Sequence, residues 1–496
     1  MGDVSEYLSG SPDAPWIDLL RPGQPHAEGR CVMLWVQRAQ RATGNRAANV
    51  AINLANHLRL PVVAVFVLTP SYPGATYRAY RFMAEGLRET ATAFRERGVG
   101  WWLRAGDPVD LVPRLADELG AAALITDADP LRTGCCWRDE IAARVSIPLV
   151  AVASDTIASP SLFPKMEFAA RTIRPKLWRA IAANDFLAAA PDRDPLLRAE
   201  FGMSDDVDPI ALIDTLPLDR TMSASPRFVG GRAEALIRLN RFITGRLATY
   251  PDQRNQPERD PHSELSPYLH FGQISPLEVA RAAIAARVGD RSWLAPGGIA
   301  IGHPDEAVED APLLAFLDEL VTQRELAINY CQRQPAYDRW QGLPAWGRAT
   351  LDQHRHDPRP VIMSPDRIEA GQTGDPLWDA AQRQLRHEGW MPNRLRMYWA
   401  KQLLQWTAQP EDAFDLAVYL DDRYFLDGRD ANGYAGVGWS IGGLHDRPFP
   451  PNKPILGLVR PMTAAGMARK FDTAAYIRMV DQRTREDESG ADGGSG

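Results

Sequence analysis

Four of the fourteen tryptophans in this 496-residue chain lie within residues 374–406: Trp378, Trp390, Trp399 and Trp406. Asp375 and Pro376 are typical of a helix start, because Asp is a favoured N-cap and proline suits the first helical position. A second helix is predicted over 393–406, and it places two of the indoles on one face, about 10 Å apart along the axis. Indoles at this spacing either relay electrons or fill a core, and the spacing alone favours the core.

The composition restricts the kinds of chemistry that the chain can carry. The cysteines (Cys31, Cys135, Cys136, Cys331) have no Cys-x-x-Cys spacing, so neither a metal site nor a disulfide framework is expected. A net charge of −7 argues against a globally basic DNA binder, although a local basic patch can still neutralise phosphates. No stretch approaches the ~20 apolar residues that span a bilayer. We expect a metal-free, cytoplasmic monomer with no membrane contact and no implied protein partner.

The first part of the chain alternates between apolar strand patterns and amphipathic helix patterns. Apolar runs such as CVMLWV, PVVAVFVL and AALITD are separated by helical stretches such as RAANVAINLANHLR. This alternation predicts an α/β domain with a doubly wound parallel sheet (Rossmann-like) over 30–155, after an N-terminal extension, 1–29. No G-x-G-x-x-G motif or Walker loop is present, so NAD and ATP binding have no support.

The rest of the chain reads as a connector followed by an all-α domain. Residues 156–225 are rich in helix and strand breakers and are predicted to be an interdomain connector. Amphipathic helical periods dominate 226–480, which predicts the second, helical domain. A long loop is expected over 289–312 and a disordered tail over 481–496.

Seven short motifs occur in a fixed order along both domains. They are YRAYRFMAEGL, EFAARTIRPK, SELSPYLHFGQIS, ELVTQRELAINYCQRQPAYD, GQTGDPLWDAAQRQL, NRLRMYWAK and LDGRDANGYAGVGWSIGGLHDRPF. Together they resemble the photolyase/cryptochrome family, in particular the class II cyclobutane-pyrimidine-dimer photolyases, from about Cys31 to Phe471. The resemblance implies an enzyme, a light-driven carbon–carbon lyase whose reduced, photoexcited FAD gives an electron to pyrimidine dimers in DNA.

The resemblance also implies a set of FAD-binding residues in the helical domain: Tyr250, Ser263, Leu265, Ser266, Arg324, Asn393, Arg396, Asp421 and Asp427. Ser266 is predicted to be a helix N-cap before Pro267, so that free backbone amides meet the pyrophosphate; plain helix capping is the ordinary alternative. Arg396 and Asp427 match the ion pair beside the flavin ring, although a structural salt bridge would use the same residue types. A second, antenna chromophore in the α/β domain is compatible with the family, and its presence and identity stay open.

The family implies a role for three of the four clustered indoles. Trp399, Trp378 and Trp406, in that order from the flavin outward, match the class II electron-transfer chain. They are therefore expected to pass an electron from the surface to photoexcited FAD. Trp390 has no counterpart in that chain, and we interpret it as core packing.

The family further implies a lesion pocket and a DNA-contacting surface. Glu319, Met397 and Trp439 match pocket residues, with Glu319 expected to hydrogen-bond or protonate a thymine carbonyl and Trp439 to stack on the dimer. A dimer is already poorly paired, so extruding it from the duplex costs less than extruding a normal base. The residues expected to contact DNA are Gln323, Arg447, Phe449, Arg460, Arg469 and Lys470.

Three of these positions depart from the family's usual residues. Gln323 stands where Trp or Arg is common, and Phe449 replaces a usual Trp in the DNA-entering loop. Asp421 stands where an Asn faces the flavin N5, and a carboxylic acid there can donate a proton as an amide cannot. These departures favour an alternative function, a cryptochrome-like photoreceptor or photoenzyme that does not repair DNA. A dark flavoprotein or nucleotide-binding protein is the third hypothesis, favoured only if the indoles prove to be packing.

Overall fold

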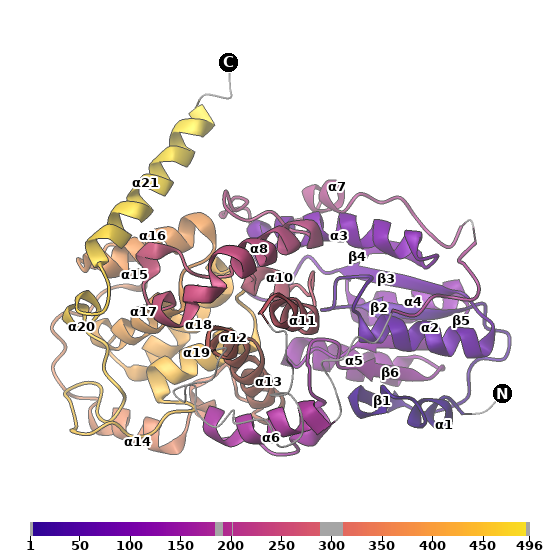
Figure 1. Cartoon of the computed structure of the whole chain (residues 1–496), viewed down its shortest axis with the longest axis horizontal. Helices are drawn as coiled ribbons and strands as arrows, with labels where there is room; N and C mark the ends of the chain where they lie inside the picture. Colours follow the sequence, from indigo (N-terminus) through magenta and orange to yellow (C-terminus); the bar gives the residue numbers. More distant parts are fainter. Residues whose placement is uncertain (1–2, 184–191, 201, 288–310, 493–496) are drawn as a thin grey trace.

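The computed structural model describes residues 3–183, 192–200, 202–287 and 311–492. Figure 1 shows a sheet with its helices at the right and a larger helical part at the left. The predicted long loop, 289–312, lies outside the described residues except for its last two, which begin helix α12. No described helix has the length and apolarity needed to cross a membrane.

The sheet has six strands in the order β1-β6-β5-β2-β3-β4. All neighbours pair in parallel except β1, which runs antiparallel to β6 at the edge. The central strands are buried along their whole length, as expected where helices cover both faces. The strands are β1 (Ile17–Arg21), β2 (Cys31–Val36), β3 (Val62–Leu68), β4 (Gly100–Ala105), β5 (Ala121–Asp127) and β6 (Leu149–Val152). The predicted doubly wound sheet is confirmed.

Helices follow most strands, and their starts have clear local causes. Asn45 caps α2 and Asp107 caps α4, where Pro108 occupies the first helical position. The helices are α1 (Val4–Ser9), α2 (Arg46–Leu58), α3 (Tyr77–Glu96), α4 (Pro108–Leu119) and α5 (Arg132–Arg144). Because α1 and β1 lie within 1–29, that segment is part of the sheet domain and more than an extension. The sequence prediction missed β1, whose mixed polarity gives a weak strand signal.

Two other segments differ from their predictions. The connector 156–225 contains helices α6 (Ala170–Ala183) and α7 (Pro209–Asp214), and α6 is tied to the helical part by an Arg174–Asp318 ion pair of 2.7 Å. The predicted disordered tail is helical as far as residue 492, as the end of α21 (Thr473–Asp492), which projects from the helical part in Figure 1. The first turns of α21 pack against α16, which anchors this helix.

The helical part is built from α8 to α21, and several of its elements surround one cavity. Between α12 and α13 the chain makes a π-helical segment, η6 (Asp318–Gln323), a feature that often occurs at functional sites. The helices besides α21 are α8 (Arg232–Gly245), α9 (Tyr250–Gln253), α10 (Ser266–His270), α11 (Pro276–Arg287), α12 (Ala311–Leu317), α13 (Arg324–Arg333), α14 (Ala345–Gln353), α15 (Pro365–Glu369), α16 (Pro376–Glu388), α17 (Asn393–Trp406), α18 (Pro410–Tyr424), α19 (Ala431–Gly442) and α20 (Ala464–Ala468).

A buried charge cluster joins the two parts of the molecule. Arg38, which follows β2, forms ion pairs with Asp430, the N-cap of α19, and with Asp155 after β6. His270 at the end of α10 lies 3.1 Å from the same Asp430 carboxylate. Removing one partner from such a buried cluster leaves an uncompensated charge, so these contacts fix the orientation of the helical part on the sheet.

Candidate functional site

The helical part encloses a cavity of about 720 Å³, within the usual range of ligand sites. Segments from α9 to α19 contribute to its wall. All nine predicted cofactor residues line it: Tyr250, Ser263, Leu265, Ser266, Arg324, Asn393, Arg396, Asp421 and Asp427. Glu319, Gln323, Met397, Trp399 and Trp439 line the same cavity. The structure thus brings together residues that are up to 189 positions apart in the chain.

One wall of the cavity is the loop that leads into α10. Leu265 is the N-cap of this helix and Ser266 is its first residue, so the prediction that Ser266 is the N-cap is wrong by one position. The Ser266 Oγ instead accepts a hydrogen bond of 3.2 Å from Trp390 Nε1. Because Trp390 also lines the cavity, its interpretation as core packing was incomplete.

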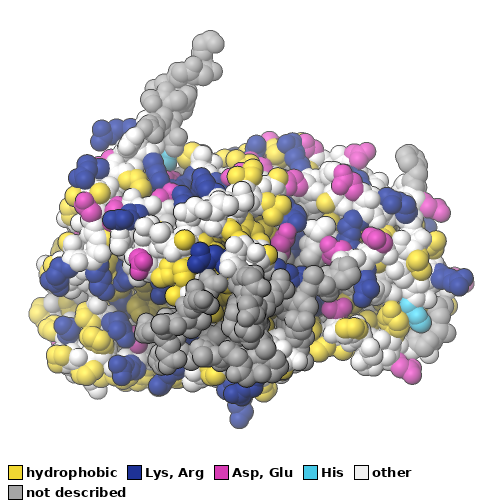
Figure 2. Space-filling model, viewed as in Figure 1, with side chains coloured by type: hydrophobic (Ala, Val, Ile, Leu, Met, Phe, Trp, Pro, Cys, Tyr) yellow, Lys and Arg dark blue, Asp and Glu magenta, His cyan; other side chains and the backbone are white. Residues whose placement is uncertain are grey.

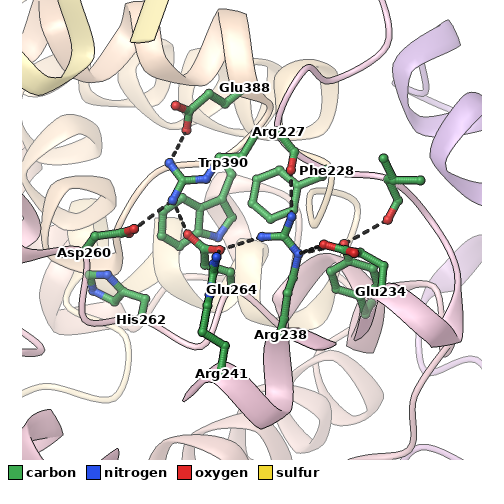
Figure 3. A network of polar contacts seen from close by, with 12 residues as sticks. Arg227, Phe228, Glu234, Arg238, Arg241, Asp260, His262, Glu264, Glu388 and Trp390 are labelled. Carbon is green, nitrogen blue, oxygen red and sulfur yellow. Dashed lines mark hydrogen bonds and ion pairs between the residues drawn. The ribbon is translucent and has the colours of Figure 1, made fainter. Parts of the chain in front are cut away.

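Glu264 holds this loop in place through the polar network drawn in Figure 3. Its backbone φ is +58°, a left-handed conformation that is unfavourable for a residue with a side chain. Its carboxylate is fully buried and accepts hydrogen bonds from Arg227, from Arg238 at 2.5 Å and from Arg241 at 2.9 Å. Three charge-assisted bonds offset the conformational cost. The sequence analysis did not identify Glu264, although its place inside SELSP was a signal.

A second wall carries paired and unpaired carboxylates. Arg396 Nη2 donates to both oxygens of Asp427, at 3.0 and 2.9 Å, which confirms the predicted pair. Asp421 is buried, and its Oδ2 has no hydrogen-bond partner among the described residues. Burial and the neighbouring Asp422 raise the pKa of Asp421 well above its usual value, while Arg396 opposes the shift. The Asp421 carboxyl is therefore a proton-holding group at the cavity wall.

The three tryptophans assigned to electron transfer form one continuous array. Trp399 lines the cavity, and its ring is stacked on Trp378 at 6.2 Å between centroids and 8° between planes. Trp378 meets Trp406 edge-on at 5.2 Å. The exposed fractions are 2% for Trp399, 0% for Trp378 and 7% for Trp406. The middle indole thus comes from α16, and it bridges the two indoles of α17.

The cavity lining also includes Glu319, from the π-helical segment, and Trp439, from α19. Glu319 forms an ion pair of 2.9 Å with Arg254. Although the Glu319 side chain is 38% exposed, it faces the confined cavity, and desolvation raises its pKa above the usual value despite Arg254. Glu319 is therefore protonated over a wider pH range than a surface carboxyl, as a hydrogen-bond donor to a carbonyl requires.

Lys401 lies behind Trp439 and was not identified from the sequence. Its side chain is buried, its Nζ donates to the Ser440 carbonyl at 2.7 Å, and it lies 4.5 Å from the centre of the Trp439 ring. Burial lowers the pKa of Lys401 to about 7. The sequence signal that could have identified Lys401 was a lysine at an apolar position of the α17 pattern.

The remaining predicted DNA contacts lie outside the cavity, on the segment after α19 and next to α20. Arg447, Arg469 and Lys470 are exposed. Arg460 is bound to Asp446 at 2.9 and 3.0 Å and lies over the Phe449 ring at 4.8 Å, so its guanidinium already has partners. On the face shown in Figure 2, basic side chains are scattered over the helical part.

A second, smaller cavity of about 120 Å³ lies in the α/β part, beyond the carboxyl ends of β2 and β3. Its lining is mainly apolar and includes Trp35, Phe66, Tyr72 and Met83. His270 lines both cavities, so the buried cluster around Asp430 forms the partition between them. Among the described residues, no group of three or more His, Cys, Asp or Glu side chains is placed to hold a metal ion.

Comparison with known proteins gives consistent matches. Residues 32–194 match the family described as DNA photolyase, and residues 316–479 match the FAD binding domain of DNA photolyase. The deoxyribodipyrimidine photo-lyase of Methanothermobacter thermautotrophicus is 35% identical, covering 92% of this chain and 96% of that protein. The deoxyribodipyrimidine photo-lyase of Potorous tridactylus is 36% identical over 91% and 82% of the two chains. The structure of a Sulfolobus tokodaii photolyase with two FAD molecules has the same fold, with a TM-score of 0.64, 19% identity and coverage of 90% and 89%.

Proposed function

The chain belongs to the DNA photolyase family, and we propose on that premise which of its residues carry the light-driven repair of pyrimidine dimers. When bound, FAD would supply the photochemistry: excited by light in its reduced form, it would lend one electron to the cyclobutane ring, which splits, and the electron would then return to the flavin. The cavity of the helical part has the size and polar lining for this dinucleotide, and the unpartnered oxygen of Asp421 offers an unused bonding position. The chain's own residues bind and orient the cofactor and the dimer, and they donate protons to them.

The α10 loop and the Arg396–Asp427 pair bind and polarise the cofactor. The backbone amides of residues 263–266 stand at a helix N-terminus, where the positive end of the helix dipole favours a pyrophosphate. Because Trp390 donates to the Ser266 oxygen, the Ser266 hydroxyl hydrogen is free to donate into the cavity. Arg396 places a positive charge at the ring-binding wall, and Asp427 fixes its direction. Asp421 holds a proton for the flavin N5.

Glu319, Met397 and Trp439 form the pocket that receives the flipped dimer. Protonated Glu319 donates a hydrogen bond to a thymine carbonyl, and the Trp439 ring supplies a stacking surface. Gln323 adds a polar group beside them. Outside the cavity, Arg447 enters the space that the dimer leaves, and Phe449 follows it in the same loop.

Phosphate contacts would come from Arg469 and Lys470, both of which are exposed. Arg460 acts indirectly in this proposal, since its ion pair with Asp446 stabilises the loop that carries Arg447. The occupied guanidinium leaves Arg460 little capacity for a phosphate of its own.

Trp399, Trp378 and Trp406 would relay electrons from a reductant in solution, such as a thiol, to oxidised FAD bound in the cavity, and the reductant would restore the outermost indole. Each ring contacts the next, so an electron crosses from the most exposed indole to the cavity in short steps. The second cavity is our candidate site for an antenna chromophore. We further propose that the α/β domain ends at residue 155 and includes β1 from the segment 1–29, that 156–225 connects the two parts, and that 226–480 is the helical domain. We also propose a cytoplasmic monomer that acts on dimer-containing DNA.

The observation that carries this proposal is the convergence of the predicted cofactor and pocket residues on one cavity. Illumination of the purified, FAD-loaded protein with an oligonucleotide that contains one thymine dimer should restore the unmodified strand, measured by chromatography. A dark sample and a protein-free illuminated sample are the controls. Intact dimer after illumination of fully reduced protein would contradict repair.

Asp421 and Gln323 support one other function, a flavin photoreceptor that does not repair DNA. Both functions use the tryptophans, but only repair requires the dimer to fit. A protein that photoreduces its FAD and leaves the dimer intact would favour this second function.

A further inference from the structure

Three indoles line the helical cavity, yet only one of them continues into an electron-transfer array. Trp399 stacks on Trp378, which leads on to Trp406. Trp390 neighbours Phe228 and His262, and no ring stacking is found for Trp439 among the described residues. Any of these indoles could in principle give an electron to a light-excited cofactor in the cavity. The surroundings of the three indoles must therefore explain why one of them gives the electron and the other two do not.

The three indoles differ in the charged groups that lie next to their rings. Lys401 Nζ lies 4.5 Å from the centre of the Trp439 ring, and no carboxylate in the described part of the chain is within ion-pair distance of it. Arg227 lies 5.5 Å from the Trp390 ring, but its charge is compensated by Asp260, Glu264 and Glu388. No Lys or Arg among the described residues lies over the Trp399 ring. Trp439 is therefore the cavity indole that faces an ammonium with no ion-pair partner among the described residues.

An ammonium over an indole stabilises the neutral ring and destabilises the oxidised one. The neutral ring attracts the cation through its quadrupole, whereas loss of an electron places two positive charges 4.5 Å apart in a poorly solvated site. Trp399 has no such penalty, and its oxidised ring can take an electron at once from the stacked Trp378. We infer that Lys401 protects Trp439 from oxidation, so that the electrons which reduce the cofactor come through Trp399, Trp378 and Trp406.

The position of Lys401 on its helix fits this role. Lys401 and Trp399 are two residues apart on α17, so their side chains leave the helix in roughly opposite directions. One side chain faces α16 and its indole, and the other faces α19 and Trp439. A buried lysine without an ion-pair partner destabilises the folded protein, so stability does not explain why position 401 carries a lysine. A role in function does explain it.

The protection should depend on pH, because burial lowers the pKa of Lys401 to about 7. The other charged groups that act on it are Asp446, which raises this pKa, and Arg460, which lowers it. Below pH 7 the ammonium is present and Trp439 is protected. As the pH rises through 7 the amine loses its proton, and the protection decreases.

The inference rests on the proposed electron relay and can be tested in FAD-loaded protein that lacks the normal donor. With a thiol as the external reductant, Trp399→Phe should photoreduce its FAD at less than one-tenth of the wild-type rate at pH 6. In Trp399→Phe/Lys401→Met the rate should recover at least fivefold, because an electron can then leave Trp439. Adding Trp439→Phe should remove this recovery. In a parallel aerobic sample without the thiol, where dissolved oxygen traps the tryptophan radical, peptide mapping by mass spectrometry should find oxidised Trp439 after illumination only where Lys401 is absent or neutral.

A second arm needs no change at Lys401, in case Lys401→Met does not fold. The Trp399→Phe protein should photoreduce faster and accumulate more oxidised Trp439 at pH 8 than at pH 6. Trp399→Phe/Trp439→Phe should lose this difference, and Trp399→Phe/Lys401→Arg, which keeps a permanent charge, should stay slow at both values. Equal rates and an unoxidised Trp439 in every variant would overturn the role of Lys401. A Trp399→Phe protein that photoreduces at the wild-type rate at pH 6, with Trp439 unoxidised, would instead overturn the relay itself.

Discussion

The two cavities of this molecule differ in size, in lining and in how they hold charge. The helical cavity is about 720 Å³ and is lined by many ionisable side chains, among them the paired Arg396 and Asp427 and the buried Asp421, whose Oδ2 has no hydrogen-bond partner among the described residues. The α/β cavity is about 120 Å³ and is mainly apolar. The polar cavity offers charged groups to a charged ligand, whereas the smaller one offers mainly apolar surface, which suits a ring system. The comparison predicts that changes in the first affect chemistry and changes in the second affect light collection.

The largest effect is expected at the Arg396–Asp427 pair. Arg396→Ala leaves the buried Asp427 carboxylate unpaired, which should cost about 3–5 kcal/mol of stability and release most of the FAD. Flavin content after gel filtration and chemical denaturation measure the two effects. Arg88→Ala, which breaks an exposed pair with Asp208, is the matched control and should cost at most about 1 kcal/mol. Full FAD retention in Arg396→Ala would show that this pair does not contribute to FAD binding.

The next effect concerns electron supply. Trp399→Phe keeps a ring in the core but breaks the contact with Trp378, so photoreduction of bound FAD should slow at least tenfold (a rough lower bound for one lost step). FAD content should not change. Trp101→Phe, which alters a buried indole of the sheet, is the control and should photoreduce normally. Equal rates in Trp399→Phe and wild type would mean that the indole array is packing.

Glu319→Gln tests the dimer pocket separately from the flavin site. Loss of a positioned proton donor should lower the repair rate about 10²-fold while FAD binding and photoreduction stay normal. Because desolvation raises the pKa of Glu319, its protonated fraction falls with rising pH, and repair by the wild type should decline over the same range. The Gln variant should show no such decline. Repair assays at several pH values check both points.

Asp421→Asn should have a smaller effect, on stability and its pH dependence. The folded-state pKa of Asp421 is raised, so its contribution is most favourable at low pH and is lost as pH rises through that pKa. Asp421→Asn should therefore stabilise the protein at alkaline pH, by at least about 1 kcal/mol, and less at pH 5. Thermal unfolding of FAD-loaded protein at the two pH values measures this. The Asp421→Asn substitution should also remove any pH dependence of proton transfer to the flavin. The same pH dependence in wild type and in Asp421→Asn would count against the photoreceptor alternative.

The smallest effect is expected in the α/β cavity. Ala79→Leu fills part of its volume without touching the helical cavity. If an antenna chromophore binds there, repair under dim light should fall while repair under saturating light is unchanged. An action spectrum compares the two proteins. Loss of repair under saturating light would show that the two cavities are not independent, as their shared wall at His270 makes conceivable.

The sequence alone predicted much of this protein because its signals are local. Alternating apolar runs gave the parallel sheet, and Asp375 with Pro376 gave the start of α16, where the Asp375 side chain caps the helix. The end-to-end range of α17, 393–406, was also predicted, since the amphipathic pattern stops where the helix stops. Failures were local too: β1 lacks a clear alternation, and Ser266 is one residue inside its helix, where its oxygen accepts a 3.2 Å bond from Trp390.

Only the tertiary structure decided how these groups act on one another. The sequence ordered Trp399, Trp378 and Trp406 by resemblance, but the position of Trp378, stacked on Trp399 and edge-on to Trp406, depends on how α16 packs. Likewise, the raised pKa of Asp421 and the lowered pKa of Lys401 arise from burial, and burial is a property of the assembled helices. Residue type fixes what a side chain can do. Its neighbours across the fold fix its charge, its hydrogen-bond partners and the ring beside it, because desolvation and Coulomb interaction depend on distances that the chain order does not contain.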